Sequence, residues 1–407
     1  IPALATERRF AQRLREHLEE QQVLDGRYQL QQVPGGRVAL PVLEEKLSQR
    51  CLPLEMPCEL VQIQDPLPSR ASRRRTPAQK LRDELRRLLG GSWSDELEQD
   101  VPRAWQRHGD LVLLSDESFQ AAPWERLGPA LWDAVASALG AQRVARRGRV
   151  LPDGMRTPNV TLLLGQDGWV EHVDNGIRYT FDVTKCMFSP GNITEKLRVA
   201  SLPCSGEVLV DLYAGIGYFT LPFLVHTGAA FVHACEWNVH AVEALRRTLV
   251  LNGVQDRCRV HHGDSRQLEL RDVADRVNLG LIPSSEEGWP VACRVLKKDT
   301  GGVLHIHHNV ETPPAPTPVL PAEEGVQEAA SSSGEAQHPM EGEAVRARIR
   351  PEWQRWAEAT ATRIQGLLAE LHGRPWGASI VHIEAVKSYA PHVHHLVLDL
   401  QCRPELP

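Results

Sequence analysis

The stretch from Glu207 to Phe219 constrains this chain more than any other. It predicts a short apolar strand at 208–210 that ends in Asp211, followed by a turn containing Gly215 and Gly217 and then an apolar helical pattern. In an α/β sheet, glycines in such a turn let the backbone approach a ligand, and the next helix turns its unpaired N–H groups toward a carboxylate or phosphate. The stretch therefore predicts a nucleoside site.

The same turn departs from the dinucleotide fingerprint. Phe219 and Thr220 stand where the third glycine of that fingerprint is expected. This departure argues against NAD and favours a smaller adenosyl ligand.

Two further acids follow predicted strands. Glu236 ends the strand at 231–235, at a spacing that suits the two ribose hydroxyls. Asp264, with Ser265, follows the strand at 257–263, where an acid can accept the adenine amino group. A lone Gly-x-Gly also fits a turn that merely needs glycine, but three acid-terminated strands in this order are more specific. We predict S-adenosylmethionine rather than another nucleotide.

The composition bounds the remaining possibilities. A chain of 407 residues is long enough for two or three domains. It contains no run of 18 or more apolar residues, so we expect no membrane span. The residues before Phe10 lack the apolar core of a signal peptide. Eight scattered cysteines without Cys-x-x-Cys fit reduced thiols, so we expect a cytoplasmic protein. Because the net charge is −6, nucleic-acid binding would have to use local basic patches.

We predict three modules. Residues 1–75 form an N-terminal module with a basic linker, 76–182 form an α+β module, and 183–407 form a Rossmann-like domain with a disordered insertion at 312–345, a segment rich in Pro, Glu, Ser and Ala. The linker carries Arg73, Arg74 and Arg75, and a second basic run carries Arg146 and Arg147. The linker arginines fit either a solvated hinge or a phosphate clamp.

The periodicity of apolar residues predicts the other elements. Helices are predicted at 10–24, 81–89, 129–139 and 350–371, with a hairpin around Gly35 and Gly36. Strands are predicted at 110–114, 160–164, 169–172, 177–182, 302–307, 378–386 and 395–400. From Cys204 onward strands and helices alternate, which indicates a doubly wound α/β sheet. The closing strand pair is typical of the class I methyltransferase sheet.

The segment 185–196 comes immediately before this sheet. Thr194 can cap a helix that begins near Glu195, and the segment can lie across the ligand mouth so that Ser189 and Lys196 reach the methionine carboxylate. The alternative for Lys196 is an exposed helix lysine.

These motifs together resemble one family. The segment 185–196, residues 211–217, Glu236-Trp237-Asn238 and the stretch 283–286 resemble the tRNA wybutosine-synthesizing protein 2 group, a branch of the tRNA guanine-N1-methyltransferase family. The resemblance is closest over 150–310 and 350–400. It implies a Rossmann-like S-adenosylmethionine domain preceded by smaller tRNA-docking modules. It also implies donor contacts from Ser189, Lys196, Glu236, Asp264 and Ser265, to which the strand and turn add Asp211, Tyr213, Gly215 and Gly217.

The turn after the fourth strand bears on the transferred group. Methylases of nucleobase nitrogens often carry Asn/Asp-Pro-Pro-aromatic there, whereas this chain keeps Asn278 and replaces the prolines with Leu279 and Gly280. The resemblance implies that the wybutosine branch has such an altered turn. That branch moves the 3-amino-3-carboxypropyl group and releases methylthioadenosine. We take Asn278, Gly280, Pro283 and Ser284 as candidates for the acceptor pocket.

The resemblance also suggests an acceptor, a tricyclic guanine derivative 3′ of the anticodon in phenylalanine tRNA, and a monomeric enzyme. Where relatives that methylate are expected to have Ser-Pro-Arg-Leu, this chain has Ser189-Pro190-Gly191-Asn192. An arginine that could stabilise charge on the target base is thus missing. The alternatives are tRNA guanine-N1 methylation by a tolerated loop variant and a non-catalytic tRNA-binding scaffold. The sequence does not identify the base that takes up the displaced ring proton.

Histidine runs raise the question of a metal. Alternation along a strand places His305 and His307 on one face, and a second run spans 392–395. No third ligand has a fitting spacing and the chemistry needs no metal, so we predict none.

Overall fold

The computed structural model describes residues 1–47, 56–73, 75–148, 157–313 and 349–407. Two compact units are present, one made of 1–106 and 117–144 and the other of 107–116 and 145–407. The unit boundaries and the predicted module boundaries fall at different positions. Each unit is described by itself.

The first unit begins with a small sheet and continues with helices. The sheet has the order β2-β3-β1-β4, and its strands are β1 (Pro2–Glu7), β2 (Gln31–Val33), β3 (Arg37–Pro41) and β4 (Cys58–Gln62). The helices are α1 (Ala11–Glu20), α2 (Arg70–Arg73), α3 (Pro77–Leu89), α4 (Asp95–Asp100) and α5 (Pro129–Leu139). Thr76 begins α3 with a capping box, because its side chain accepts from Gln79 N–H while the Gln79 side chain accepts from Thr76 N–H. The predicted basic linker begins, in the structure, with the short helix α2.

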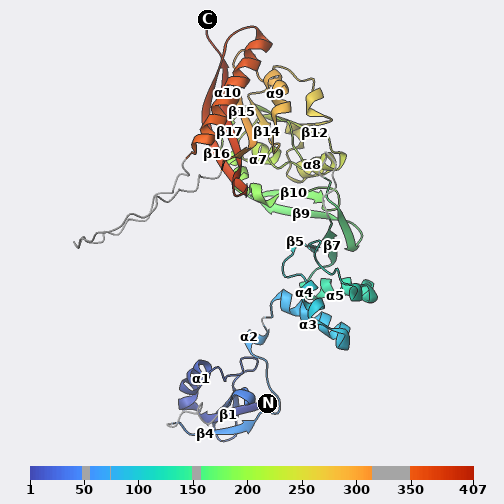
Figure 1. Cartoon of the computed structure of the whole chain (residues 1–407), viewed down its shortest axis with the longest axis vertical. Coiled ribbons are helices and arrows are strands. Elements are labelled where there is room, and N and C mark those ends of the chain that lie inside the picture. The colour runs from blue at the N-terminus through green and yellow to red at the C-terminus, as the bar shows by residue number, and fades with distance from the viewer. Residues whose placement is uncertain (48–55, 74, 149–156, 314–348) are drawn as a thin grey trace, which may run out of the picture. The chain divides into compact units, whose positions relative to one another are not determined.

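The second unit is built on a seven-stranded sheet in the order β13-β12-β11-β14-β15-β17-β16 (Figure 1). Its strands are β11 (Val208–Asp211), β12 (Phe231–Glu236), β13 (Cys258–His262), β14 (Arg276–Leu279), β15 (Gly302–Glu311), β16 (Trp376–Ala390) and β17 (Val393–Pro404). The strands β11 to β15 pair in parallel, and β17 pairs antiparallel with both β15 and β16. The predicted Rossmann-like methyltransferase sheet is confirmed.

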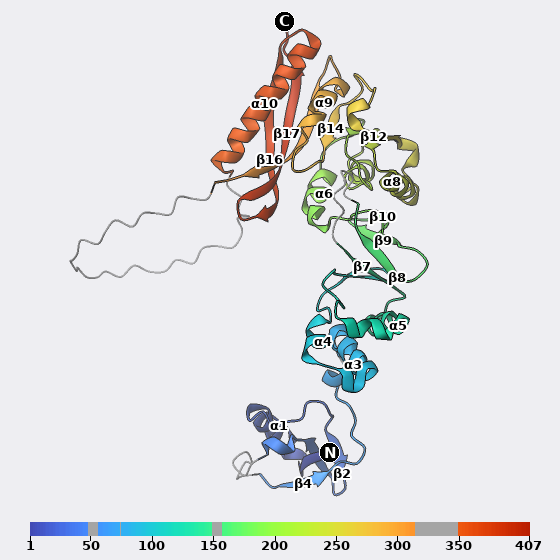
Figure 2. The same cartoon turned by 45° about the vertical axis from the view of Figure 1, so that its right-hand side comes forward.

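Helices cover both faces of this sheet. They are α6 (Ile193–Ala200), α7 (Thr220–His226), α8 (Val239–Leu251), α9 (Trp289–Val295) and α10 (Pro351–His372). Successive residues of β11 point to opposite faces, so Leu209 joins the apolar core with α7 and α8, whereas Val210 joins the core with α9 and α10. The helix α10 lies along β16 in both views (Figure 2).

Two smaller strand groups precede the sheet. The strands β5 (Gln106–His108), β6 (Leu111–Leu114), β7 (Arg143–Arg147) and β8 (Val160–Leu164) form a sheet in that order, and β9 (Trp169–Asp174) and β10 (Ile177–Asp182) form a hairpin. The hairpin is attached to α8, because Arg178 N–H donates to Asn252 Oδ1 at 3.0 Å and Thr180 N–H donates to Thr248 Oγ1 at 3.1 Å.

The first residues of the predicted insertion at 312–345 belong to the described part of the chain. Strand β15 continues to Glu311, and Thr312 N–H still donates to the His392 carbonyl at 2.7 Å. Residues 314–348 lie outside the described residues. In the described parts of the chain, no helix is both long enough and apolar enough to cross a membrane. The cysteines of these parts are free thiols.

Candidate active site

A cavity of about 640 Å³ opens where the carboxyl ends of β11, β12 and β14 meet. Its volume lies in the range of small-molecule sites, and its place is the usual ligand crevice of an open α/β sheet. The predicted donor residues that line it are Ser189, Tyr213, Gly215, Glu236, Asp264 and Ser265. The predicted acceptor residues that line it are Gly280, Pro283 and Ser284. The lining does not include Lys196, Asp211, Gly217 or Asn278.

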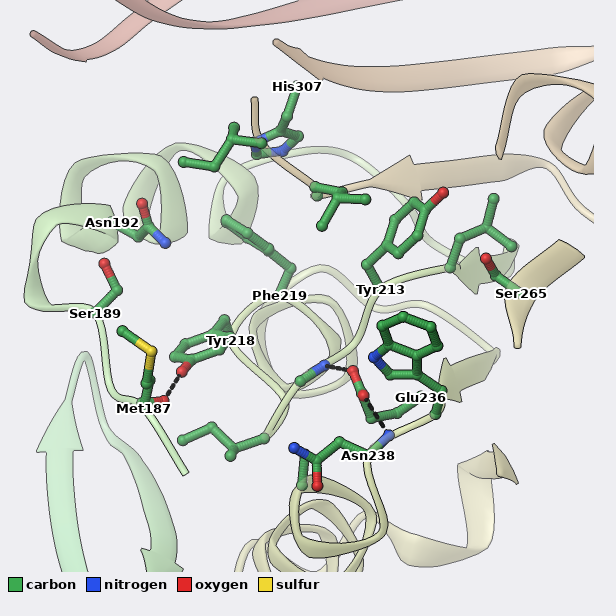
Figure 3. A pocket seen from close by; sticks show the side chains of 18 of the residues that line it. Met187, Ser189, Asn192, Tyr213, Tyr218, Phe219, Glu236, Asn238, Ser265 and His307 are labelled. Atoms are coloured by element: carbon green, nitrogen blue, oxygen red, sulfur yellow. Dashed lines mark hydrogen bonds between the residues drawn. The ribbon is translucent and has the colours of Figure 1, made fainter. Parts of the chain in front are cut away.

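Glu236 fixes the glycine turn at the cavity floor (Figure 3). Its two carboxylate oxygens accept from Gly215 N–H at 3.0 Å and from Asn238 N–H at 2.9 Å. Burial raises the pKa of Glu236, and these N–H donors act against that rise. Each carboxylate oxygen has a second lone-pair site, so both can still accept from a ligand's hydroxyls.

Asp264 lies on the cavity wall together with Ser265. The Asp264 carboxylate accepts from Arg266 N–H at 2.9 Å and pairs with the Arg266 guanidinium at 2.7 Å. The hydrogen bonds from Arg266 lower the pKa of Asp264, so this group is an anion at neutral pH. Three N–H groups of Arg266 donate to this carboxylate, which leaves about one of its four lone-pair positions for an amino group.

Asp211 is buried beneath the site. Its carboxylate accepts from the Thr220 hydroxyl at 2.7 Å and from the Asn278 amide at 3.2 Å. Burial raises the pKa of Asp211 to about 6. These contacts join β11, β14 and α7, so in this structure Asp211 and Asn278 support the site from behind its wall.

The two glycines of the turn are required for different local reasons. Gly215 has φ +58°, and a Cβ there would lie 2.8 Å from the ring of Tyr218. Gly217 has φ +106°, and a Cβ there would lie 2.5 Å from Leu221 Cδ2. Both positions therefore demand glycine, but for Gly217 the constraint comes from helix packing rather than from the cavity.

Lys196 differs from both sequence expectations. It is not an exposed lysine, since its side chain is buried, and in this structure its ammonium group pairs with Asp174 at 3.0 Å instead of lining the cavity. The charge lies over the rings of Tyr179 and Phe188, 4.6 and 4.9 Å from their centroids. Its sequence neighbourhood could not show that partner, which comes from the β9 strand.

Several lining residues were not predicted from the sequence to belong to the donor or acceptor site. They are mostly apolar or aromatic and include Met187, Tyr218, Phe219, Trp237, Leu281, Tyr389 and the histidines His307 and His395. Tyr218 donates its hydroxyl hydrogen bond to the Met187 carbonyl, which attaches the 185–192 segment to the glycine turn. The positions of Tyr218 and Trp237, directly after the glycines and the acid, were the available signal.

The turn after β14 rests on β15. Asn309 N–H donates to the Pro283 carbonyl at 2.8 Å, and the Ser285 hydroxyl donates to the His307 carbonyl at 3.3 Å. A Cβ at Gly280 would lie 3.2 Å from the Asn278 amide and 3.5 Å from the Phe219 ring. The turn thus brings bare backbone to the cavity wall.

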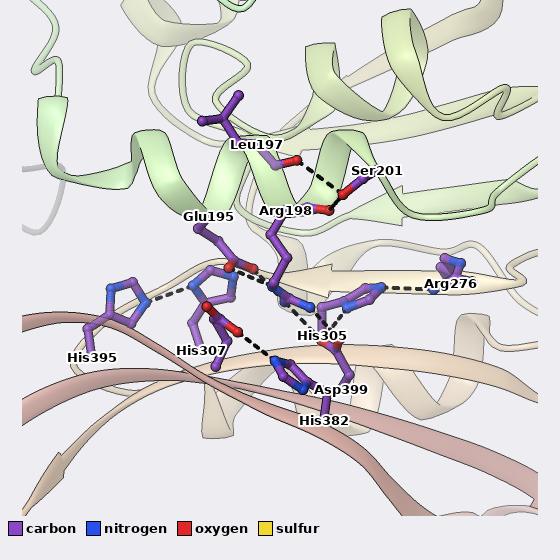
Figure 4. A network of polar contacts seen from close by, with 11 residues as sticks. Glu195, Leu197, Arg198, Ser201, Arg276, His305, His307, His382, His395 and Asp399 are labelled. Carbon is purple, nitrogen blue, oxygen red and sulfur yellow. Dashed lines mark hydrogen bonds and ion pairs between the residues drawn. The ribbon is translucent and has the colours of Figure 1, made fainter. Parts of the chain in front are cut away.

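Polar side chains form a network behind the cavity (Figure 4). Arg198 pairs with Glu195 and Asp399, both at 2.6 Å, and His305 Nδ1 lies 2.7 Å from Asp399 Oδ1. His305 and His307 share a face as predicted, and both are buried. Among the described residues, no three His, Cys, Asp or Glu side chains are arranged to hold a metal ion.

The predicted phosphate-binding arginines occupy varied settings. Arg75 pairs with Asp83 at 2.7 Å, Arg146 and Arg147 belong to β7, and Arg147 is exposed. Arg73 ends α2, and Arg74 lies outside the described residues. Arg146 and Arg147 belong to the same unit as the cavity, and neither lines it.

Family models match most of the chain up to residue 323. The model described as the TRM5/TYW2 methyltransferase domain matches residues 170–323, and two models described as TYW2 N-terminal domains match 3–72 and 85–168. A tRNA wybutosine-synthesizing protein 2 homolog of Rattus norvegicus is 59% identical over 99% of this chain and 97% of its own length. The chain belongs to the tRNA wybutosine-synthesizing protein 2 family. The homolog of Homo sapiens is 57% identical over 99% of this chain and 95% of its own.

Solved structures of other proteins share the fold. Pyrococcus horikoshii TYW2, solved in complex with MeSAdo, has a TM-score of 0.54 and 26% identity over 79% of this chain and 98% of its own. Trm5b from Pyrococcus abyssi has a TM-score of 0.57 at 21% identity over 99% of each chain, a likeness of fold alone. The family assignment made from sequence motifs is confirmed.

Proposed function

We propose that this chain is an S-adenosylmethionine-dependent tRNA aminocarboxypropyltransferase. It transfers the 3-amino-3-carboxypropyl group to a tricyclic, guanine-derived base of tRNA and releases methylthioadenosine. The observation that carries the proposal is the cavity itself, which unites three features in a chain 59% identical to a wybutosine-synthesizing relative. These features are the glycine turn, two strand-end carboxylates and a turn that lacks the Pro-Pro pair.

The residues present suit the donor. We expect the carboxylate of Glu236 to accept from ribose hydroxyls and Asp264 with Ser265 to meet the adenine edge, since all three residues line the cavity. Trp237 and Ile216 supply apolar contacts for a nucleoside. Ser189, on the segment before α6, remains our candidate for the amino acid arm.

The turn at 279–283 bears on which carbon of the sulfonium is transferred. Transfer requires the nucleophile to lie in line with the breaking S–C bond, about 3 to 3.5 Å from the carbon. Leu279 and Gly280 replace the Pro-Pro pair of the base-gripping turn, and Gly280 and Leu281 line the cavity wall. We therefore expect the acceptor to sit differently from the target of an N1-methylase. The amino acid arm, rather than the methyl group, then lies nearest the acceptor.

For the acceptor, we propose the modified purine 3′ of the anticodon in phenylalanine tRNA. The enzyme would act as a cytoplasmic monomer that holds tRNA phosphates with Arg73–Arg75, Arg146 and Arg147. The modules that precede the Rossmann-like domain would supply most of this docking.

Donor labelled separately in its methyl and carboxyl carbons tests the proposal. With tRNA that carries the tricyclic precursor, the carboxyl label is expected in tRNA and the methyl label in methylthioadenosine. Methyl label in tRNA, with adenosylhomocysteine released, would instead identify a tRNA methyltransferase. Release of neither nucleoside would leave a tRNA-binding scaffold.

A further inference from the structure

Two buried histidines meet at the cavity wall. His307 on β15 and His395 on β17 have only 2% and 3% of their surface exposed, and both line the cavity. His307 Nδ1 lies 2.8 Å from His395 Nε2, so one ring donates a hydrogen bond to the other (Figure 4). The antiparallel pairing of β15 with β17 fixes this contact, since His395 lies opposite Asn309, two residues from His307.

The outer nitrogens of the pair, His307 Nε2 and His395 Nδ1, are the ring nitrogens that take no part in the hydrogen bond between the rings. Neither His307 Nε2 nor His395 Nδ1 has a hydrogen bond to any described residue, although both atoms are buried. A neutral imidazole carries one N–H and one lone pair. If His307 donates within the pair, its Nε2 holds a lone pair and His395 Nδ1 holds a hydrogen; if His395 donates, the assignment reverses. In either case the neutral pair has one unprotonated outer nitrogen.

The surroundings keep both rings neutral. Burial lowers the pKa of His395 to about 4, and it lowers the pKa of His307 well below the ordinary value. The neighbouring His395, His305 and the Arg198 cation also lower the pKa of His307, whereas Asp399 acts in the opposite direction. One outer nitrogen of the pair therefore stays unprotonated at physiological pH.

The pair lies at the end of the cavity away from the nucleoside acids. The His307 ring contacts Phe219, with ring centroids 5.2 Å apart, and in Figure 3 Phe219 separates His307 from Glu236. Tyr389, which also lines the cavity, lies 6.1 Å from the His395 ring. An aromatic ring placed here would meet Phe219, Tyr389 and the imidazoles, so this end suits the acceptor base.

We propose that the His307–His395 pair is the base that removes the proton from the acceptor carbon. This inference rests on the proposed aminocarboxypropyl transfer. As the acceptor carbon bonds to the γ-carbon of the arm, the S–C bond breaks and its electron pair neutralises the sulfonium. The cationic ring then loses its C–H proton to the unprotonated imidazole nitrogen, and the C–H electron pair returns to the ring. The imidazolium later releases the proton to water. Because that ring cation is a strong acid, a weakly basic imidazole suffices.

Two variants remove an outer nitrogen but keep the hydrogen bond between the two side chains. His307→Asn retains an amide near the Nδ1 position, and His395→Gln retains one near the Nε2 position, so each preserves the mutual hydrogen bond and removes an outer nitrogen. Each is expected to lower the single-turnover rate by roughly 10²- to 10⁴-fold, the usual contribution of a general base. Since the pair acts as a unit, the double variant should cost little more than either single change. Donor affinity, measured by calorimetry, should stay unchanged.

Deuterium at the acceptor carbon reports on the proton step directly. In the variants, proton removal becomes rate-limiting, so the primary isotope effect should rise above that of the unaltered chain; imidazole added to His395→Gln should restore part of the rate. His308→Gln is the matched control, because His308 lies next on β15, stacks on Trp356 and does not line the cavity. Should the first variants not fold, His307→Gln and His395→Asn also remove the basic nitrogens, with the amide near the outer position instead.

The outcomes distinguish this inference from the proposed function. Methylthioadenosine from the unaltered chain, with undiminished rates or an unchanged isotope effect in folded variants, would overturn the histidine base alone. An unaltered chain that releases no methylthioadenosine would remove the transfer on which the inference rests.

Discussion

The ammonium group of Lys196 lies 3.0 Å from the Asp174 carboxylate, and the two side chains are only 3% and 6% exposed. Lys196 belongs to α6 and Asp174 ends β9, so the pair attaches the hairpin to the Rossmann-like sheet's first helix. Burial lowers the pKa of Lys196, and the hydrogen bond to Asp174 acts against that change. The same carboxylate oxygen lies 3.2 Å from His172 Nε2.

Removing one member of this pair should destabilise the fold. Lys196→Met leaves the Asp174 carboxylate buried without its cation, and loss of one partner of a buried ion pair costs about 3 to 5 kcal/mol. The double variant Lys196→Met/Asp174→Asn should regain part of that free energy of unfolding. Urea denaturation measures both, with Lys298→Met on the surface as a control. An equal loss in the double variant would show that the pair contributes through packing alone.

Removing the Glu236 carboxylate should weaken donor binding. Glu236→Ala deletes the acceptor for the ribose hydroxyls and frees the Gly215 and Asn238 N–H groups, so we expect affinity for S-adenosylmethionine to fall by about tenfold or more. Calorimetric titration measures this change. Glu243→Ala is the control, since Glu243 is exposed on α8 and pairs with Arg247. Unchanged affinity in Glu236→Ala would remove Glu236 from the donor site.

Sequence pattern over a few residues predicted those features of the fold and site that depend on neighbouring residues alone. Sequence pattern predicted the strands that end in Asp211 and Glu236 and the glycine turn between them. Strand alternation, the need for glycine at positive φ and acids at strand ends are all visible within a few residues of sequence. The ion-pair partner of Lys196 could not be predicted from local pattern, because Asp174 lies 22 positions away on a hairpin.

The histidine pair shows the same limit more strongly. His307 and His395 are 88 positions apart, and only the pairing of β15 with β17 brings them together at the cavity wall. Alternation predicted a shared face for His305 and His307, but it could not show that one turns to Asp399 and the other to His395. Asp211 illustrates a different limit: the strand end was predicted correctly, whereas the inward direction of its carboxylate depends on Thr220 and Asn278.

Neutralising the basic runs should weaken tRNA binding for all tRNAs alike. We expect Arg146→Ala/Arg147→Ala, and separately Ala in place of Arg73 to Arg75, to lower affinity and to reduce the salt slope by about one for each phosphate that is no longer neutralised. Binding to labelled tRNA across a series of salt concentrations measures both quantities. Arg355→Ala on α10, where Arg355 pairs with Glu352, is the control. A large fall in affinity with an unchanged slope would show that these arginines do not act on phosphates.

Stability should depend on pH through Asp211. Burial raises its pKa in the folded protein from 3.8 to about 6, so the folded state retains a proton that the unfolded chain loses between these values. The free energy of unfolding therefore falls as pH rises through this window, by about 3 kcal/mol from this group. Asp211→Asn cannot titrate, so between pH 3 and 7 it should lose less stability than the unaltered chain by that amount. Its changed hydrogen bonds with Thr220 and Asn278 add only a constant offset. Urea denaturation at intervals across this range measures the difference, and parallel pH curves would show that Asp211 ionises in the folded state as readily as in the unfolded chain.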